Sequence, residues 1–461
     1  MYGEPGALEP GDSATVKVHT EPIEGSDHTI FFNRGSVATQ EYARRFQNRK
    51  PNEVGQAAYD WLSRGLIEGI IAFIQRAKSS RWGLKGAFYE FQWPAVLNAL
   101  RQAKADGADV RVVFDDIENA SGPREKNELA IRDAHIKTIC TPRQNGKLMH
   151  NKFLVLLENG KPQAVLFGST NLTENGIFGH ANCAHVVENH DIAAKYLSYF
   201  EKLAEDPEIS SRTSDYKDWT VEETPAPATA YDADMAAVFS PRSGLEALEW
   251  YAKIAGDARK GLFMTFAFGM NSLFRDVFAK EDDVLRMGLM EKEWNGRNKE
   301  AQIAAIRAVQ ALPNVVIAIG NRIVLNEFDQ WLQELDKIVS HAHVQWVHTK
   351  FMLADPLSDH PIIVTGSANF SDASTKTNDE NMLVIRNDTR VADIYLGEFM
   401  RLHSHYAFRQ AVAIFLEQNP GAKPEDFRQR FLIEGRTDWT KPYFDRNDRQ
   451  GRYTRRDYFR G

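Results

Sequence analysis

The chain has 461 residues, of which 43% are hydrophobic and 26% charged, so it can bury a sizeable core and has room for two domains. Its formal net charge of −7 and pI near 6.0 argue against strong nonspecific attraction to nucleic acid or anionic membranes, although a basic cleft can lie within an acidic surface. Its two cysteines, Cys140 and Cys183, are too few for a disulfide framework and lack zinc-ligand spacing.

Residues 1–50 predict a β-rich N-terminal extension, because 14–19 and 28–33 have the pattern of two short strands. The first 16 residues have neither the basic start nor the apolar run of a signal peptide. Nowhere do 18 apolar residues follow one another, so we expect no membrane span. We therefore expect a cytoplasmic protein; an exported form that has lost its leader would show the same pattern.

Residues 51–215 predict an α/β unit. The segment 86–91 has the pattern of a buried strand, and a helical stretch (93–106) and two further strands (110–114 and 135–140) follow it. Strands that are apolar on both faces and alternate with helices favour a largely parallel sheet.

A second unit at 236–420 repeats this order, after a Pro/Ala-rich linker at 216–235. The fold class we expect is α/β, with two pseudo-symmetric halves packed side by side, each a mostly parallel mixed sheet flanked by helices. The tail, 421–461, mixes arginines with aromatic residues and is expected to pack on the surface by stacking. An insert at 321–346 occurs in the second half alone and is expected to lie near the substrate pocket.

An internal repeat organises the chain. His150-x-Lys152 is echoed 198 residues later by His348-x-Lys350. Eighteen residues after each histidine a Gly-Ser-x-Asn turn begins, with Ser169 and Asn171 in the first copy and Ser367 and Asn369 in the second. Chance gives one H-x-K easily, but rarely two with the same spacing to the same turn.

These residue types suit the cleavage of a phosphodiester without a metal, which needs a nucleophile, a proton donor and fixed positive charge. Positions i and i+2 of a strand share a face, so each histidine points the same way as its lysine. The turns bring hydroxyl and amide donors, and Ser169 and Ser367 are predicted substrate-binding residues. Two copies facing each other would surround one phosphate, and we expect no cofactor and no metal site.

The doubled pattern resembles the phospholipase D superfamily, whose mark is H-x-K-x4-D followed by G-S-x-N, twice per active site. The resemblance covers roughly residues 55–409 and implies two phospholipase D-type halves and a phosphohistidine intermediate. One histidine would attack phosphorus and the other would protonate the leaving group, with water or an alcohol releasing the product. Family substrates include phospholipids, nucleic acids and protein–DNA adducts.

Two positions depart from an even repeat. The family's aspartate is Asp355 in the second copy but Leu157 in the first, so we expect weaker local support there; an inactive first half is the competing view. Thirty-two residues after each histidine stand Asn182 and Glu380. Since a carboxylate partner raises a histidine pKa more than an amide does, we hypothesise that Asn182 orients His150 as the nucleophile and Glu380 pairs with an acidic His348.

Other chemistry-bearing residues have simpler interpretations. Asp115 and Asp116 are expected to end a strand and cap a helix in solvent. His341 and His343 lack a third ligand nearby and are expected to form a strand face, not a metal site.

The sequence leaves the substrate open. We marginally favour hydrolysis of phospholipid head groups; an endonuclease or nucleic-acid phosphodiesterase using the same site is the alternative, and a phosphate-binding module without activity is a third reading. Transfer to an alcohol in place of hydrolysis stays open. No obligatory protein partner is evident, and a monomer is plausible because both motifs lie in one chain.

Overall fold

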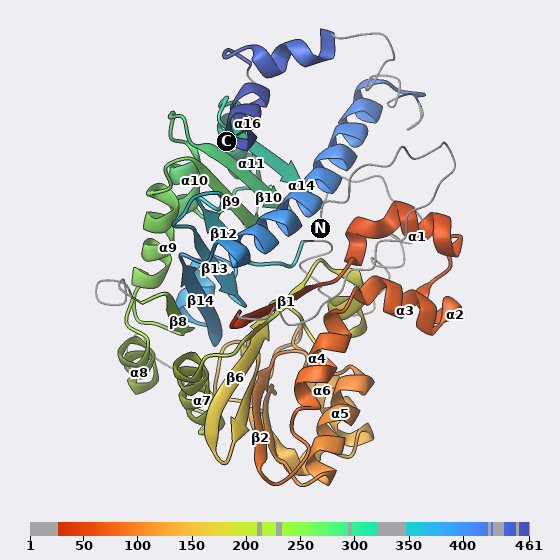
Figure 1. The fold of residues 1–461 in the computed structure, drawn as a ribbon, viewed down its shortest axis with the longest axis vertical. Coiled ribbons are helices and arrows are strands. Elements are labelled where there is room, and N and C mark those ends of the chain that lie inside the picture. Colours follow the sequence, from red (N-terminus) through yellow and green to blue (C-terminus); the bar gives the residue numbers. More distant parts are fainter. Residues whose placement is uncertain are drawn as a thin grey trace.

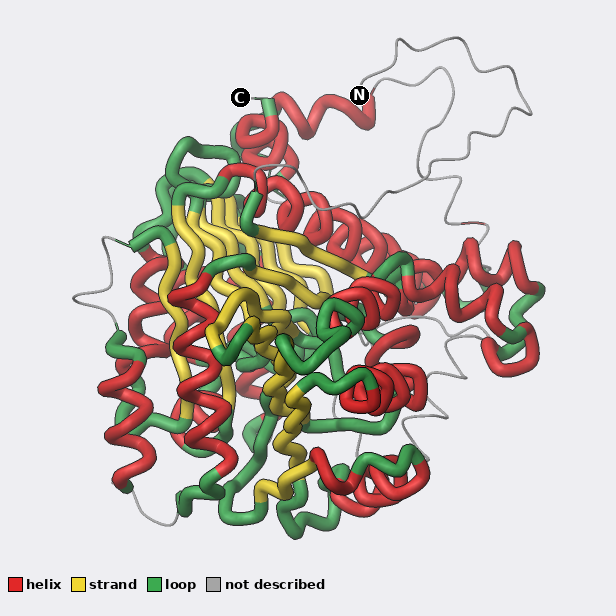
Figure 2. The backbone as a smooth tube through the Cα atoms, turned by 60° about the horizontal axis from the view of Figure 1, so that its bottom comes forward, coloured by secondary structure: helices red, strands yellow, loops and turns green. Residues whose placement is uncertain are grey.

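The computed structural model describes residues 26–209, 214–226, 233–293, 297–320, 347–422, 426, 438–448 and 451–460. Within them the chain forms two seven-stranded sheets, the first in the lower part of Figure 1 and the second in the upper part. Turned by 60°, the strands lie inside a shell of helices (Figure 2).

The first sheet has the order β1-β7-β6-β5-β2-β3-β4. Its strands are β1 (His28–Phe32), β2 (Trp82–Phe88), β3 (Asp109–Asp115), β4 (Cys140–Arg143), β5 (Lys152–Glu158), β6 (Lys161–Gly168) and β7 (Cys183–Val187). The second sheet has the matching order β11-β10-β9-β12-β13-β14-β8. Its strands are β8 (Met235–Ser240), β9 (Gly261–Phe266), β10 (Leu285–Met290), β11 (Val315–Ile319), β12 (Phe351–Ala354), β13 (Ile362–Gly366) and β14 (Glu380–Arg386). The predicted pair of α/β halves is confirmed.

The expectation that each sheet is mostly parallel is wrong. Only β2–β3 and β3–β4 pair in parallel in the first sheet, and β9–β10 and β10–β11 in the second; the other four pairs of each sheet are antiparallel. Helices cross over between the parallel strands. From each motif strand onward the connections are shorter: Asn159 and Gly160 alone join β5 to β6, both with positive φ, which makes a tight hairpin.

Helices cover both sheets. In the first half they are α1 (Thr39–Phe46), α2 (Pro51–Val54), α3 (Gln56–Ser63), α4 (Leu66–Ile74), α5 (Pro94–Ala105), α6 (Arg124–Asp133) and α7 (His190–Ala204), with the short turns η1 (Gly35–Ala38), η2 (Lys137–Ile139) and η3 (Asn175–Gly179). Then follow α8 (Asp215–Glu223), α9 (Glu246–Gly256), α10 (Ser272–Phe278), α11 (Lys299–Gln310), α13 (Asp372–Lys376), α14 (Thr389–Gln418), η5 (Asp438–Phe444) and α16 (Arg452–Phe459). None of these described helices is long and apolar enough to cross a membrane.

The last helix of each half packs against the other half. On α7, Tyr199 stacks on Phe239 of β8 with ring centroids 4.2 Å apart. On α14, which runs diagonally in Figure 1, Tyr395 meets Phe32 of β1 edge to face at 5.4 Å. A continuous hydrophobic core joins the two halves through these contacts, and buried aromatic surface of this kind is a main source of stability.

The structure also shows parts of the predicted extension, linker and tail. The described part of the N-terminal extension supplies only the edge strand β1 and then short helices, and residues 14–19 lie outside the described part. The expected linker begins with a helix, α8, that packs on β8. In the tail, the ring of Tyr458 on α16 lies 5.4 Å from that of Phe263, so this helix packs on the second half. The insert at 321–346 lies outside the described residues.

Candidate active site

The two motif histidines stand just before the strands β5 and β12 and are held by backbone bonds between the halves. The His150 N–H donates to the carbonyl of Asp379 at 2.9 Å, and the His348 N–H donates to the carbonyl of Ala181 at 3.2 Å. These two contacts are related by the 198-residue repeat. The segment that precedes β14 therefore positions the first histidine, and the segment that precedes β7 positions the second.

The two imidazole rings lie face to edge with their centroids 6.4 Å apart, and both side chains are buried. A phosphate group with one hydrogen-bond length on either side fits that separation. The structure thus brings together two histidines that are 198 residues apart in the sequence.

The predicted partners of the histidines are exchanged. His150 Nδ1 lies 2.9 Å from the Glu380 carboxylate, and His348 Nδ1 lies 2.8 Å from the Asn182 amide oxygen. The hypothesis that each histidine pairs within its own half is therefore wrong. The physical reason is the backbone pairing between the halves, which carries each of these acceptors across to the opposite histidine.

The two motif serines hold these acceptors in place. Ser169 Oγ donates to Asn182 Oδ1 at 2.8 Å, and Ser367 Oγ donates to Glu380 Oε2 at 2.6 Å. Both serine side chains are fully buried. The two serines therefore orient the histidine partners, and their contact with substrate stays a prediction.

The two motif lysines are also buried, and each Nζ donates to the carbonyl of its own histidine at 2.6 Å. Burial lowers the pKa of Lys152 to about 7. It also holds the pKa of Lys350 well below its usual range, with Lys152 acting in the same direction. A phosphate anion between the two lysines would favour their charged forms.

The motif asparagines Asn171 and Asn369 occupy matching places in the two halves. Within the described part of the chain, the Oδ1 atom of each is buried without a hydrogen-bond partner. Buried acceptor oxygens of this kind are costly unless a donor group of a ligand or of water satisfies them.

The two histidines differ in electrostatics. Burial lowers the pKa of His150 to about 4; Glu380 opposes this shift and Lys152 adds to it. Burial, then Lys350 and then His180, hold the pKa of His348 well below its usual range. Only His150 has a carboxylate partner, so of the two rings it better tolerates a positive charge.

Two buried carboxylates support the residues before the histidines. Asp115, at the end of β3, accepts the N–H of Met149 at 2.8 Å, and Glu291 accepts the N–H of Val347 at 2.9 Å. The prediction that Asp115 ends a strand is confirmed, but the solvent-exposed capping role is wrong. Burial raises the pKa of Asp115 to about 7.

Asp379, whose carbonyl receives the His150 N–H, is anchored by a buried ion pair between the halves. Arg143 Nε lies 3.0 Å from its carboxylate, both side chains are 0% exposed, and the Tyr216 hydroxyl donates to the same carboxylate at 3.0 Å. The equivalent position in the first half is Ala181, so this anchor serves the His150 side of the site alone.

Asp355 lies away from the histidines and accepts three backbone N–H groups, of Arg259, Lys260 and Gly261, at 2.7–2.9 Å. It fixes the turn that leads into β9. In the first half Leu157 packs against β2 beside Gly83 instead. The first half therefore has apolar packing at Leu157, where the second half has the hydrogen bonds of Asp355.

Three residues at the site were missed by the sequence reasoning. The His180 ring lies 5.7 Å from that of His348, the Tyr89 ring lies 5.1 Å from that of His150, and Glu90 interacts electrostatically with Lys152. A signal for His180 existed, because it stands two residues before Asn182. Tyr89 and Glu90 follow β2 without any motif.

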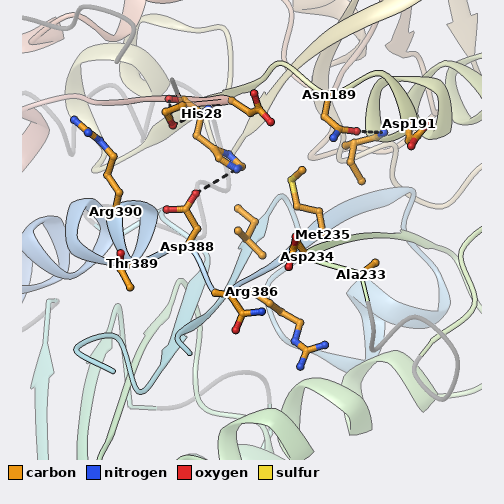
Figure 3. A pocket seen from close by; sticks show the side chains of 15 residues that line it. His28, Asn189, Asp191, Ala233, Asp234, Met235, Arg386, Asp388, Thr389 and Arg390 are labelled. Carbon is orange, nitrogen blue, oxygen red and sulfur yellow. Dashed lines mark hydrogen bonds and ion pairs between the residues drawn. The ribbon is translucent and has the colours of Figure 1, made fainter. Parts of the chain in front are cut away.

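Among the described residues no group of three histidine, cysteine or acidic side chains could hold a metal ion, and His341 and His343 lie outside them. A separate pocket of about 760 Å³ lies between the halves, at the starts of β1, β8, α7 and α14. There His28 points toward Asp388 at 3.8 Å (Figure 3). No motif residue lines this pocket, so it is distinct from the histidine site.

Comparisons with solved structures find matches at low identity. Phosphatidylserine synthase from Haemophilus influenzae Rd KW20 is 11% identical with a TM-score of 0.51, over 78% of this chain and 90% of that one. Polyphosphate kinase from Porphyromonas gingivalis is 12% identical with a TM-score of 0.46, over 81% of this chain, which spans about half (53%) of the kinase. Nuc from Salmonella typhimurium is 18% identical with a TM-score of 0.27, over 37% of this chain and 94% of that one.

At these identities the likeness concerns the fold alone. No curated protein matches the sequence. The family model described as the cardiolipin synthase, phospholipase D-like domain matches residues 70–204 and 308–403, together half of the chain. These two segments include both motif histidines and the partners of their rings. The part of the second half before residue 308 lies outside the match. The chain therefore belongs to the phospholipase D-like family.

Proposed function

We propose that the protein is a metal-independent phosphodiesterase that works through a phosphohistidine and hydrolyses the head groups of phospholipids. The observation that carries the reaction class is the pair of imidazoles 6.4 Å apart, each with its Nδ1 engaged by an acceptor of the other half. This arrangement leaves the two Nε2 atoms for the reaction. Both histidines belong to one chain, so the proposed chemistry needs no second subunit.

His150 is the proposed nucleophile. Attack of its Nε2 on phosphorus leaves positive charge on the ring, and the Glu380 carboxylate, which accepts its Nδ1–H, stabilises that charge. His150 is thus the proposed nucleophile here as in the sequence analysis. The reason is now its contact with the Glu380 carboxylate, not an orienting contact with Asn182. The P–O bond to the head group breaks as the N–P bond forms.

His348 is the proposed acid. Its partner, the neutral Asn182 amide, does little to stabilise an imidazolium, so the protonated ring gives up its Nε2 proton readily. The proton goes to the departing oxygen. In the second step water attacks phosphorus, its proton passes to His348, and the N–P bond to His150 breaks.

Lys152, Lys350, Asn171 and Asn369 are proposed to hold the non-bridging phosphate oxygens. The two lysines supply positive charge and the two amides supply N–H donors, a combination that stabilises the charge that develops on phosphorus. Because these side chains fill the roles that a metal ion would otherwise take, the proposal predicts activity in excess EDTA.

Two comparisons support the lipid substrate. The matching family model is described as a cardiolipin synthase domain, and a solved structure of similar fold, with a TM-score of 0.51, is named a phosphatidylserine synthase. The net charge of −7 disfavours a general nucleic-acid binder.

The test offers the protein vesicles of phosphatidylcholine and phosphatidylethanolamine in excess EDTA and measures released choline and ethanolamine. We expect release that His150→Ala abolishes. Products in which an added primary alcohol replaces the head group would change the assignment from hydrolase to transferase. Nicking of supercoiled plasmid in EDTA, lost in the same variant and without lipid turnover, would replace the lipid with nucleic acid.

The roles of the histidines are tested by trapping the phosphoenzyme with acid quench. We expect His348→Ala to accumulate phosphoenzyme and His150→Ala to form none. The opposite pattern would exchange the two roles.

A further inference from the structure

His180 is a third histidine at the site, and it breaks the symmetry of the two halves. Its ring centroid lies 5.7 Å from that of His348 with an interplanar angle of 37°, and its side chain is buried. The equivalent position in the second half is Asn378. The first half therefore contributes an extra titratable ring on the side of the proposed acid.

The backbone of His180 is tightly fixed. Its N–H donates to the Asn175 carbonyl at 2.9 Å, and its own carbonyl accepts from the Asn33 amide at 2.6 Å. The next residue, Ala181, accepts the N–H of His348. The two rings are thus held by neighbouring backbone contacts, and their separation is a built feature of the fold.

The side chain of His180 contacts an asparagine amide. Its Nε2 lies 2.9 Å from the Asn175 amide nitrogen, so Nε2 accepts there when the ring hydrogen is on Nδ1. An asparagine amide presents its oxygen after a half-turn, so the same contact can also receive an Nε2–H.

Among the described residues, His348 and Glu90 interact electrostatically with His180. Glu90 also interacts with Lys152 and Asn171, so it links this corner to the proposed phosphate-binding groups. A second carboxylate, Glu291, accepts the N–H of Val347, the residue that precedes His348.

In the proposed reaction His348 must be protonated before cleavage, and its own surroundings disfavour the charged ring. The acid must start protonated, yet this ring is buried between two lysines and its own partner is a neutral amide. In the proposed reaction the attacking water returns a proton to His348, and a neighbouring base is needed to hold that proton while the buried ring is neutral. His180 is the one described histidine besides His150 whose ring lies against it.

We propose that His180 is a proton-relay residue that protonates His348 before cleavage and takes the proton back afterwards, an inference that rests on the proposed function. A separation of 5.7 Å between ring centroids is spanned by a small ring rotation or one water molecule. His180 loses a proton and His348 gains it. His348 then gives it to the leaving oxygen, and the proton from the attacking water returns along the same path.

His180→Asn is the matched test, because it installs the residue of the second half. Two substrates are compared: phosphatidylcholine, whose leaving alkoxide needs a proton, and a nitrophenyl phosphodiester, whose nitrophenolate leaves without one. We expect the ratio of kcat for the choline ester to kcat for the nitrophenyl ester to fall at least tenfold. We also expect the pH profile with the choline ester to lose one ionisation.

If His180 has only a structural role, His180→Asn lowers both activities together and leaves the ratio of the two kcat values unchanged. That result would overturn the proposal. A variant with unchanged rates and an unchanged ratio would overturn it as well. His135→Asn removes an exposed histidine and serves as the control, with no change in ratio. The thermal unfolding of each variant shows whether it is folded. If wild type and His150→Ala are equally inactive on both substrates, the proposed function fails; if wild type is active through His150 and the ratio stays constant, only the relay fails.

Discussion

Replacing Glu380 by glutamine tests whether the crossed partner of His150 makes it the nucleophile. Glutamine keeps the size of the side chain, and its amide oxygen can still accept the Nδ1–H of His150 and the Ser367 hydroxyl, now 2.9 and 2.6 Å from the carboxylate. The variant therefore removes the charge and the weak bond that Oε1 accepts from the Asn378 amide at 3.4 Å. Both histidines then have neutral amide partners, and the chemical difference between the halves disappears at this position.

The expected size of the effect follows from the contact. Two unit charges about 4 Å apart interact by about 4 kcal/mol at an effective dielectric constant of about 20. If about half of the ring charge has developed in the transition state, the loss is about 2 kcal/mol. That corresponds to roughly a 30-fold slower formation of phosphoenzyme. By contrast, Asn182→Ala removes a neutral hydrogen bond from His348, which contributes about 1 kcal/mol.

The assay is rapid acid quench with a nitrophenyl phosphodiester, whose leaving group needs no proton and which therefore reports on the nucleophile alone. We expect Glu380→Gln to slow the appearance of phosphoenzyme about 30-fold and Asn182→Ala to change it little. If Asn182→Ala slows this step and Glu380→Gln leaves it unchanged, the electrostatic reasoning is refuted and His348 is the nucleophile.

Three further outcomes follow from the buried charges. Because burial holds the pKa of His150 at about 4 and the neutral ring is the reactive form, the acid limb of kcat/KM for a nitrophenyl ester should lie near pH 4, not near 6.5. Arg143→Met strands the buried Asp379 carboxylate and should cost about 3–5 kcal/mol in urea unfolding, of which the double variant with Asp379→Asn recovers the part due to the unpaired carboxylate but not the bonds of Arg143 to Asp206 and Pro207. Asp355→Ala loses three backbone bonds and should cost about 2–4 kcal/mol in the same assay, with kcat per folded molecule unchanged.

The sequence could predict which residues meet, because the repeat identifies them in pairs. It could not predict which histidine meets which acceptor. The alignment of the copies places Asn182 with His150 and Glu380 with His348, whereas the actual partners depend on how the halves pair their backbones. That pairing is a tertiary property, and two alternative assignments fit the same spacing equally well.

The sheet was predicted as mostly parallel because its strands are buried on both faces, which is usual for parallel sheets. The signal against this lay in Asn159-Gly160, a two-residue turn sequence that favours a hairpin. The edge position of β1 was not predictable in the same way. Its partner β7 is far along the chain, and a short strand pattern does not show which sheet it joins.

Symmetry poses a chemical problem for a site built from two copies of one motif. Identical histidines with identical partners would have equal pKa values, and neither would be favoured as nucleophile or as acid. The structure resolves this with two differences between the copies, Asn182 opposite Glu380 and His180 opposite Asn378. Because the partners cross over, each half sets the chemistry of the histidine on the other. A substitution of Asn182 or Glu380 therefore changes the surroundings of the histidine in the opposite half.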